Sequence, residues 1–349
     1  MCGLAGWVPP RVVTNDDLSQ YLDTSDEWIT TRTGIRQRHF AEPGQATSDL
    51  AVEAGQRALA AAGVERVDAV VVATTTPDRS CPATAPLVAH RLGLTGAAAF
   101  DVSAVCTGFV YGLATAAGLI TAGVAGSVLL IGADTYTTIV DPLDRANAII
   151  FGDGAGAVVL RAGTADEPGA VGHFDLGSDG AEEEMIMVAA GGSRQRSQPD
   201  SQPTRAERHY TMEGRAVFRH AITRMSASAR ASLDAADWKV DDVDHLVPHQ
   251  ANKRILRAVA DDLGLPRERC VSHVESVGNT GAASIPLALA DAAAGDVLKP
   301  GDRVLLTAFG GGLTWGSCVL RWPELTPPTP PATAAAAPVT AQEGGPLAP

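Results

Sequence analysis

The stretch "DVSAVCTGFVYGL" (101–113) joins a short apolar run to a run of small and apolar residues, and Cys106 stands at the junction. The first run has the composition of a buried strand, and the second has that of a helix. A strand followed directly by a helix is the repeating unit of α/β proteins. The stretch therefore predicts that Cys106 lies where a strand ends and a helix begins.

Similar strand and helix patterns occur on both sides of this stretch. Apolar runs rich in Val, Leu and Ala predict buried strands at 68–76, 127–134, 156–163, 244–249 and 302–309. Runs with helical composition lie at 48–63, 108–123, 214–237 and 252–265. This alternation predicts an α/β protein in which helices cover the faces of a sheet.

The predicted units recur within the chain. The strand containing Val128 has a counterpart at Val304, at an offset of 176 residues. The tripeptide "CTG" that begins at Cys106 likewise has a counterpart in "NTG", which begins at Asn279. Each tripeptide precedes a helical run that leads to a "VLL" strand. We expect two similar halves, with Cys106 and Asn279 at equivalent strand-to-helix junctions.

Length and composition limit the class of protein. The 349 residues are 45% hydrophobic, which suits one large or two moderate globular units. The net charge of −13 disfavours a nucleic-acid partner. No apolar run approaches the roughly 18 residues that a membrane span needs, and no signal peptide is evident, so we expect a cytoplasmic protein without membrane contact. The five cysteines are scattered, which predicts reduced thiols and no metal site.

We expect three segments along the chain. They are an N-terminal half with the cysteine nucleophile (1–165), a C-terminal half with the histidine and asparagine (166–322), and a disordered Pro/Ala-rich tail (323–349). Within the second half, the polar stretch 189–210 lacks apolar periodicity. It predicts a long surface loop.

Three polar residues stand at predicted strand ends. On its own, Cys106 fits a small buried hydrophobe better than a nucleophile whose pKa is lowered by a helix N-terminus. His249 ends the strand at 244–249, where a histidine is often only structural, and Asn279 lies at the second junction. Sites in α/β sheets assemble at strand ends, and a thiol, an imidazole and an amide together suit acyl transfer.

These residues lie in segments that resemble the β-ketoacyl-acyl-carrier-protein synthase III family of the thiolase superfamily. The resemblance covers residues 3–322. The matching segments are "TSDEWITTRTGIRQRH" (24–39), "FDVSAVCTGFVYGL" (100–113), "DRANAIIFGDGAGAVVL" (144–160), "PHQANKRI" (248–255), "GNTGAASIPLAL" (278–289) and "AFGGGLTWGS" (308–317).

The resemblance implies a thiolase-like fold of five layers, αβαβα, built from duplicated halves and assembled as a homodimer. It implies that Cys106 takes an acyl group from acyl-CoA or an acyl carrier protein, and that malonyl-carrier protein then loses CO₂ and attacks that acyl group. His249 and Asn279 would donate hydrogen bonds to the malonyl thioester oxygen, and the N–H groups of Cys106 and Gly311 would form an oxyanion hole. The reaction would start fatty acid or polyketide chains. The resemblance implies that the phosphopantetheinyl carrier protein is a substrate and that no cofactor is permanently bound.

The resemblance also implies binding residues outside the catalytic set. Trp28, Arg32 and Arg145 would hold the adenine of CoA, although Trp28 and Arg32 also fit an ordinary cation–π pair on a helix. Asn252 would contact the pantetheine arm, although it also fits a helix N-cap. A basic patch would attract the acidic carrier protein; it consists of Arg215, Arg219, Lys253, Arg254 and Arg257.

One position departs from the family pattern. Cys81 stands where relatives often have a bulky aromatic residue that closes the acyl pocket of the partner subunit. A smaller residue predicts a roomier pocket and a longer, branched or aromatic acyl group, unless Tyr136 or the 189–210 stretch fills the space. Thr107 replaces a smaller residue beside Cys106, and we attach no function to it.

Three alternatives remain open at this stage. The enzyme could move an intact acyl group to a carrier protein, an alcohol or an amine without decarboxylation. It could be a catalytically silent scaffold, although all three polar residues are retained. It could be a degradative thiolase, but that activity requires a second cysteine in the C-terminal glycine segment. We place Cys318 in the core instead.

Overall fold

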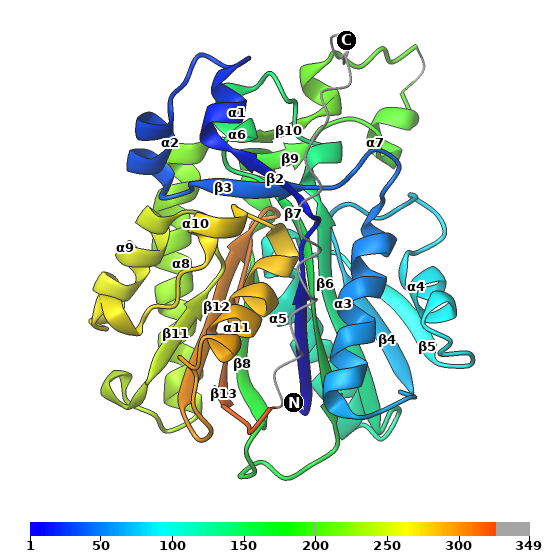
Figure 1. Ribbon diagram of the computed structural model, residues 1–349, viewed down its shortest axis with the longest axis vertical. Helices are drawn as coiled ribbons and strands as arrows, with labels where there is room; N and C mark the ends of the chain where they lie inside the picture. Colours follow the sequence, from blue (N-terminus) through cyan, green and yellow to red (C-terminus); the bar gives the residue numbers. More distant parts are fainter. Residues whose placement is uncertain (199, 326–349) are drawn as a thin grey trace, which may run out of the picture.

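The computed structural model describes residues 1–198 and 200–325 (Figure 1). The predicted tail (323–349) therefore lies outside the described residues from position 326 onward. Two β-sheets form the framework. Their strands come from residues 3–161 and 171–321 respectively.

The first sheet has five strands. Their order across the sheet is β1 (Gly3–Trp7), β7 (Asp153–Arg161), β6 (Ser127–Thr135), β4 (Ala69–Ala73) and β5 (Ala98–Val102). Strand β4 runs parallel to both β5 and β6, whereas β7 runs antiparallel to β6 and β1. All residues of β4 are buried, which explains why its sequence is continuously apolar.

The second sheet repeats this topology. Its order is β11 (His245–Pro248), β12 (Arg303–Gly310), β13 (Thr314–Arg321) and β8 (Val171–Ser178). Strand β11 runs parallel to β12, and β13 runs antiparallel to β12 and β8. A parallel bridge between Leu246 and Cys270 takes the place that β5 has beside β4. The duplication predicted from the sequence is therefore confirmed.

Helices complete five layers. Two helices, α5 (Gly108–Thr121) and α11 (Ser284–Ala294), lie between the sheets, and each contacts strands of both (Figure 1). Helix α3 (Thr47–Ala62) covers the outer face of the first sheet, and α4 (Ala85–Arg91) lies beside it. Helices α8 (Gly214–Ala235) and α9 (Lys253–Leu263) form the outer layer on the second sheet. This is the expected αβαβα arrangement.

The two halves approach each other closely at Gly132 of β6. A Cβ atom at this position would lie 2.3 Å from the carbonyl oxygen of Ala282, which belongs to the turn before α11. Only glycine allows the backbones to come so near. The contact brings β6 against the 3-10 turn Gly281–Ala283, which follows Asn279.

Shorter elements lie at one end of the sheets (Figure 1). Two antiparallel two-stranded sheets are among them: β2 (Arg11–Thr14) with β3 (Gln37–Phe40), and β9 (Ile186–Val188) with β10 (Tyr210–Met212). The short helices are α1 (Asn15–Ser19), α2 (Asp26–Thr33), α6 (Arg145–Ala148), α7 (Ser193–Arg196) and α10 (Val274–Val277).

The stretch 189–210 only partly fits the expected surface loop. Most of its described residues are exposed, and it contains α7 and a short 3-10 turn. However, Tyr210 at its end is only 4% exposed, because it pairs with Val188 in the β9–β10 sheet and its N–H donates to the carbonyl of Ile139. Among the described residues, no helix combines the length and apolarity needed to span a bilayer.

Candidate active site

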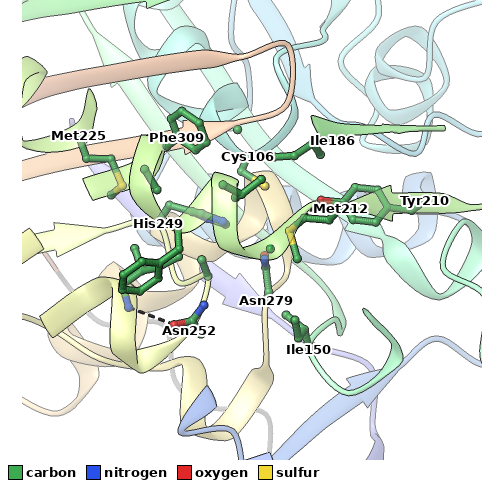
Figure 2. Close-up of a pocket in the computed structure, with 17 residues that line it drawn as sticks. Cys106, Ile150, Ile186, Tyr210, Met212, Met225, His249, Asn252, Asn279 and Phe309 are labelled. Carbon is green, nitrogen blue, oxygen red and sulfur yellow. Dashed lines mark hydrogen bonds between the residues drawn. The ribbon is translucent and has the colours of Figure 1, made fainter. Parts of the chain in front are cut away.

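One cavity brings together the three polar residues singled out in the sequence. Cys106, His249 and Asn279 all line it, as do Tyr210, Asn252 and Phe309 (Figure 2). Cys106 comes from the first half of the chain, whereas His249 and Asn279 come from the second. The cavity thus lies where the two halves meet.

Cys106 lies in a 3-10 turn, Val105–Thr107, between β5 and α5. Val105 has a φ of 47°, a left-handed conformation that costs a β-branched residue roughly 1–3 kcal/mol. Gly310 at the end of β12 packs against this turn. A Cβ atom on Gly310 would lie 2.8 Å from the Cys106 nitrogen. The thiol is thus held by a strained turn with the glycine segment directly against it.

The thiol of Cys106 is buried, with 6% of the residue exposed. Burial raises the pKa of Cys106 to about 12, although the Tyr136 hydroxyl, with Oη 3.8 Å from Sγ, acts in the opposite direction. Of the two local interpretations of Cys106, a buried residue and a thiol whose pKa is lowered by the helix N-terminus, the raised pKa favours the first as a description of its surroundings. Loss of solvation around the thiolate outweighs the nearby dipoles. Without a substrate, Cys106 is a neutral thiol at pH 7.

His249 follows β11 and is 3% exposed. Its backbone N–H donates a hydrogen bond of 2.8 Å to the carbonyl of Thr307 on the neighbouring strand β12. This bond fixes the main chain at His249. Burial lowers the pKa of His249 to about 3, so the imidazole is neutral at pH 7. Its Nδ1 lies 2.7 Å from Oγ of Ser284, the first residue of α11.

Asn279 is held by its backbone and by its side-chain oxygen. Its N–H donates to the carbonyl of Ile150 at 2.9 Å, and its carbonyl accepts from the N–H of Gly152 at 3.0 Å. Its Oδ1 accepts a hydrogen bond from the N–H of Gly281 at 3.0 Å. The amide group that is available to a ligand is therefore Nδ2, which is a donor.

Asp134, which the sequence analysis did not single out, connects the two halves beneath the site. The carboxylate is fully buried and accepts hydrogen bonds from the N–H groups of Thr75 at 2.7 Å and Ala282 at 2.8 Å. Burial raises the pKa of Asp134 to about 6, and these bonds partly offset that rise. The carboxylate thus ties the strand ends of the first half to the turn before α11.

The two predicted acyl-pocket residues lie in different surroundings. Tyr136 is fully buried beside Cys106 and stacks on Phe151 with ring centroids 4.5 Å apart. Tyr210 meets the Tyr136 ring edge-on at 5.7 Å. Cys81 is exposed and does not line the cavity of its own chain. Within the glycine segment, Gly310 lines the cavity and Gly311 does not.

The predicted CoA-binding residues converge from separate elements. The guanidinium carbons of Arg32 and Arg145 lie 4.7 Å and 4.3 Å from the centroid of the Trp28 ring. Arg32 and Trp28 belong to α2, whereas Arg145 begins α6. Asn252 both lines the cavity and caps α9, with its Oδ1 accepting from the N–H of Ile255 at 3.0 Å.

The predicted docking residues divide into two groups. A surface groove that shares Asn252 with the cavity is lined by Arg32, Arg215, Arg219 and Arg254. Lys253 and Arg257 do not line this groove, and Lys253 forms an ion pair with Glu275.

Comparison with known proteins places the chain in a family. The family model described as 3-oxoacyl-[acyl-carrier-protein (ACP)] synthase III matches residues 100–180, and the model of its C-terminal part matches residues 233–322. Beta-ketoacyl-[acyl-carrier-protein] synthase III 5 of Streptomyces coelicolor is 60% identical over 326 residues, which is 93% of this chain and 98% of that protein. The chain belongs to the 3-oxoacyl-ACP synthase III family.

Solved structures of this family have the same fold. The synthase III of Pseudomonas aeruginosa PAO1 superposes with a TM-score of 0.88 at 55% identity, and the match covers 93% of this chain and 98% of that one. The priming β-ketosynthase of the R1128 polyketide pathway has a TM-score of 0.86 at 35% identity, with 94% and 96% covered. These matches confirm the predicted thiolase-like fold.

Besides Asp134, sequence reasoning missed several residues of the synthase III site. Phe309 and Tyr210 line the cavity, and Ser284 contacts His249. Phe309 precedes the glycine segment, and Ser284 lies five residues after Asn279, so both stand within segments that the sequence analysis quoted. Tyr210 had no such signal, because it ends a polar stretch.

Proposed function

We propose that this chain loads an acyl group onto Cys106 and joins it to a malonyl group on an acyl carrier protein, with loss of CO₂. The main support is the convergence of Cys106, His249 and Asn279 in one buried cavity. A thiol nucleophile together with two neutral hydrogen-bond donors suits a reaction that passes through an enolate. A silent scaffold would have no need of this arrangement.

In the loading step, Sγ of Cys106 attacks the carbonyl carbon of an acyl thioester. A new C–S bond forms, the C–S bond to the donor breaks, and the Cys106 proton leaves with the departing thiol. Because burial raises the pKa of Cys106 and lowers that of His249, an ion pair between them is disfavoured in the free enzyme. The proton therefore moves only as the new bond forms.

In the condensation step, the malonyl thioester loses CO₂ and its C2 carbon becomes an enolate carbon. His249 and Asn279 donate hydrogen bonds to the thioester oxygen as negative charge develops there. The enolate carbon then attacks the acyl carbonyl on Cys106, the Cys106 C–S bond breaks, and the sulfur takes up a proton. The occupied Oδ1 of Asn279 supports this role because it leaves Nδ2 as the donor.

Charge on the acyl oxygen would be stabilised by the backbone N–H groups of Cys106 and Gly311. The close approach of the neighbouring Gly310 to the Cys106 turn supports this assignment. We further propose a homodimer in which Cys81 of each chain borders the acyl pocket of the other and, because it is small, leaves that pocket roomier. Tyr136 does not itself line the cavity, and its buried ring would support the nucleophile from behind, with Oη 3.8 Å from Sγ of Cys106.

Substrates would enter past α2, α8 and α9. The Trp28 ring and its two arginines would hold the adenine of CoA, with Asn252 beside the pantetheine arm. The arginine-lined groove at the cavity mouth would attract the acidic carrier protein. Lys253 would contribute less to this attraction because Glu275 neutralises its charge.

The experiment that tests this function is intact-mass spectrometry. The enzyme is first offered a panel of acyl-CoAs and then malonyl-carrier protein, with Cys106→Ala as the control. We expect an acyl adduct on the wild type only, and its release as a product two carbons longer. An adduct that ignores malonyl-carrier protein and moves intact to an alcohol or amine would instead identify a simple acyltransferase.

A further inference from the structure

Ser284 connects the start of α11 to the imidazole of His249. The residue is 1% exposed. Its Oγ lies 2.7 Å from Nδ1 of His249 and accepts a hydrogen bond from the N–H of Gln250 at 3.3 Å. No role in the reaction has been given to this hydroxyl so far.

The hydrogen-bond donors around this oxygen determine the direction of the bond to His249. A backbone N–H can only donate, so the Gln250 N–H occupies one lone pair of Ser284 Oγ. Within the described part of the chain, the remaining hydrogen-bond partner of Oγ is Nδ1 of His249. If Nδ1 carried the proton, the buried hydroxyl proton of Ser284 would lack an acceptor, which costs about 1–3 kcal/mol. The hydroxyl therefore donates to Nδ1, and Nε2 carries the ring proton.

Gln250 keeps this arrangement rigid. The side chain is fully buried, and its Nε2 donates to the carbonyls of Pro248 at 2.7 Å and Val271 at 3.3 Å. Its Oε1 accepts from the N–H groups of His273 at 2.8 Å and Val274 at 3.2 Å. These four bonds tie the Gln250 side chain to the main chain at Pro248 and at residues 271–274, so the Gln250 N–H stays directed at Ser284.

We propose that Ser284 is a positioning residue that holds His249 in the tautomer with its proton on Nε2. In this state the imidazole donates a hydrogen bond into the cavity and cannot accept the proton of Cys106. The proposal rests on the function proposed above and deepens it. It assigns His249 to the enolate-forming step alone.

The two half-reactions should therefore respond differently to loss of the hydroxyl. Loading of Cys106 does not use a donor at Nε2, so it should be unaffected by a change at Ser284. Decarboxylation of the malonyl group does use this donor. We expect Ser284→Ala to lower kcat for condensation by about 10–100-fold with little change in KM, the size of effect seen when the partner that orients a metal-binding histidine is lost.

The test combines kinetics with a spectroscopic readout. Acyl loading from acyl-CoA and release of CO₂ from malonyl-carrier protein are measured separately for the wild type, Ser284→Ala and Ser284→Thr. ¹⁵N NMR of the histidine rings then reports which nitrogen of His249 is protonated. We expect the Nε2–H form in the wild type and in Ser284→Thr, and a mixture of tautomers in Ser284→Ala.

A matched control separates this role from general damage to the core. Ser232 of α8 is also fully buried, and its hydroxyl has no hydrogen-bond partner among the described residues, so Ser232→Ala removes a buried hydroxyl that neither contacts His249 nor lines the cavity. It should leave both half-reactions unchanged. Equal losses of loading and CO₂ release in Ser284→Ala, or an unchanged tautomer with full condensation, would overturn the proposal. If the wild type neither loads nor condenses, the function fails instead, whereas the NMR result still tests the tautomer.

Discussion

The junctions at Cys106 and Asn279 occupy corresponding places before the two central helices, yet they hold their polar side chains in different ways. Cys106 follows strand β5, whereas Asn279 follows the short helix α10, so the strand end expected at Asn279 was wrong. Each junction leads through a 3-10 turn into a central helix. At the first junction the Tyr136 hydroxyl is the hydrogen-bond partner that the described residues offer the thiol, and burial raises the pKa of Cys106. At the second, the amide oxygen is bonded to the N–H of Gly281. The duplicated backbone thus presents a desolvated nucleophile on one side and a fixed donor on the other.

The largest expected effect comes from exchanging the side chains at these junctions for alanine. Cys106→Ala removes the only atom to which the acyl group is attached, so both loading and condensation should be lost completely. Asn279→Ala removes one donor from the enolate oxygen, so condensation should fall by about 10²–10³-fold while loading continues. Intact mass measures loading, and product analysis measures condensation. If Asn279→Ala lost loading as much as condensation, Asn279 would not act in the condensation step alone.

A smaller effect concerns the pH dependence of the thiol. Alkylation proceeds through the thiolate, so below the pKa its rate rises about tenfold per pH unit. Because burial raises the pKa of Cys106 to about 12, the rate should still be rising at pH 10 in the free enzyme. An ordinary cysteine flattens near pH 8.5. The measurement follows the Cys106 peptide by mass spectrometry after brief iodoacetamide pulses, which separates it from the exposed Cys81.

If the alkylation rate of Cys106 reached a plateau below pH 8, the thiolate would not be destabilised overall by its burial. Such a plateau would mean that the helix N-terminus and Tyr136 stabilise the thiolate more than burial destabilises it. Comparison with Tyr136→Phe identifies the contribution of the hydroxyl. That variant should shift the alkylation profile to higher pH, because the hydrogen bond from the Tyr136 hydroxyl lowers the pKa of Cys106.

The fold was largely predictable because its central strands are buried on both faces. The fully buried β4 and the almost fully buried β6 appear in the sequence as continuous apolar runs, and the helix predicted at 48–63 differs from α3 by one residue at each end. The small sheet of β2 and β3 was missed because its residues are mostly half-buried or exposed and lack such a run. Tyr210 was missed because its burial comes from Val188 and Ile139, which are distant in sequence.

The electrostatic properties of the site were less predictable. The positions of Cys106, His249 and Asn279 followed from their motifs, but the pKa of Cys106 depends on the residues that surround it in three dimensions. Asp134 looks in the sequence like a polar residue that ends a strand. Its role requires donors from Thr75 and Ala282, which lie 59 and 148 residues away. Such long-range contacts leave no local pattern.

The last prediction tests how closely the two junctions are coupled. A Cβ atom added in Gly132→Ala would meet the carbonyl oxygen of Ala282 at 2.3 Å and its carbon at 2.9 Å. Both atoms are backbone, so the halves must separate. We expect a loss of about 1–3 kcal/mol in the free energy of unfolding, measured with denaturant. Condensation should decline more than loading, because the shift moves the Asn279 turn relative to Cys106.

The control for this prediction is Gly118→Ala in α5, where the added Cβ meets no atom within 4 Å. Replacing an exposed glycine in a helix should stabilise the protein by about 0.5–1 kcal/mol and leave both half-reactions unchanged. If Gly132→Ala lowers the free energy of unfolding and Gly118→Ala raises it, the effect of Gly132 arises from the contact between the halves. Wild-type stability in Gly132→Ala would mean that the halves can separate without cost. The hydrogen bond that Asn279 donates would then not require a fixed distance between the Cys106 and Asn279 junctions.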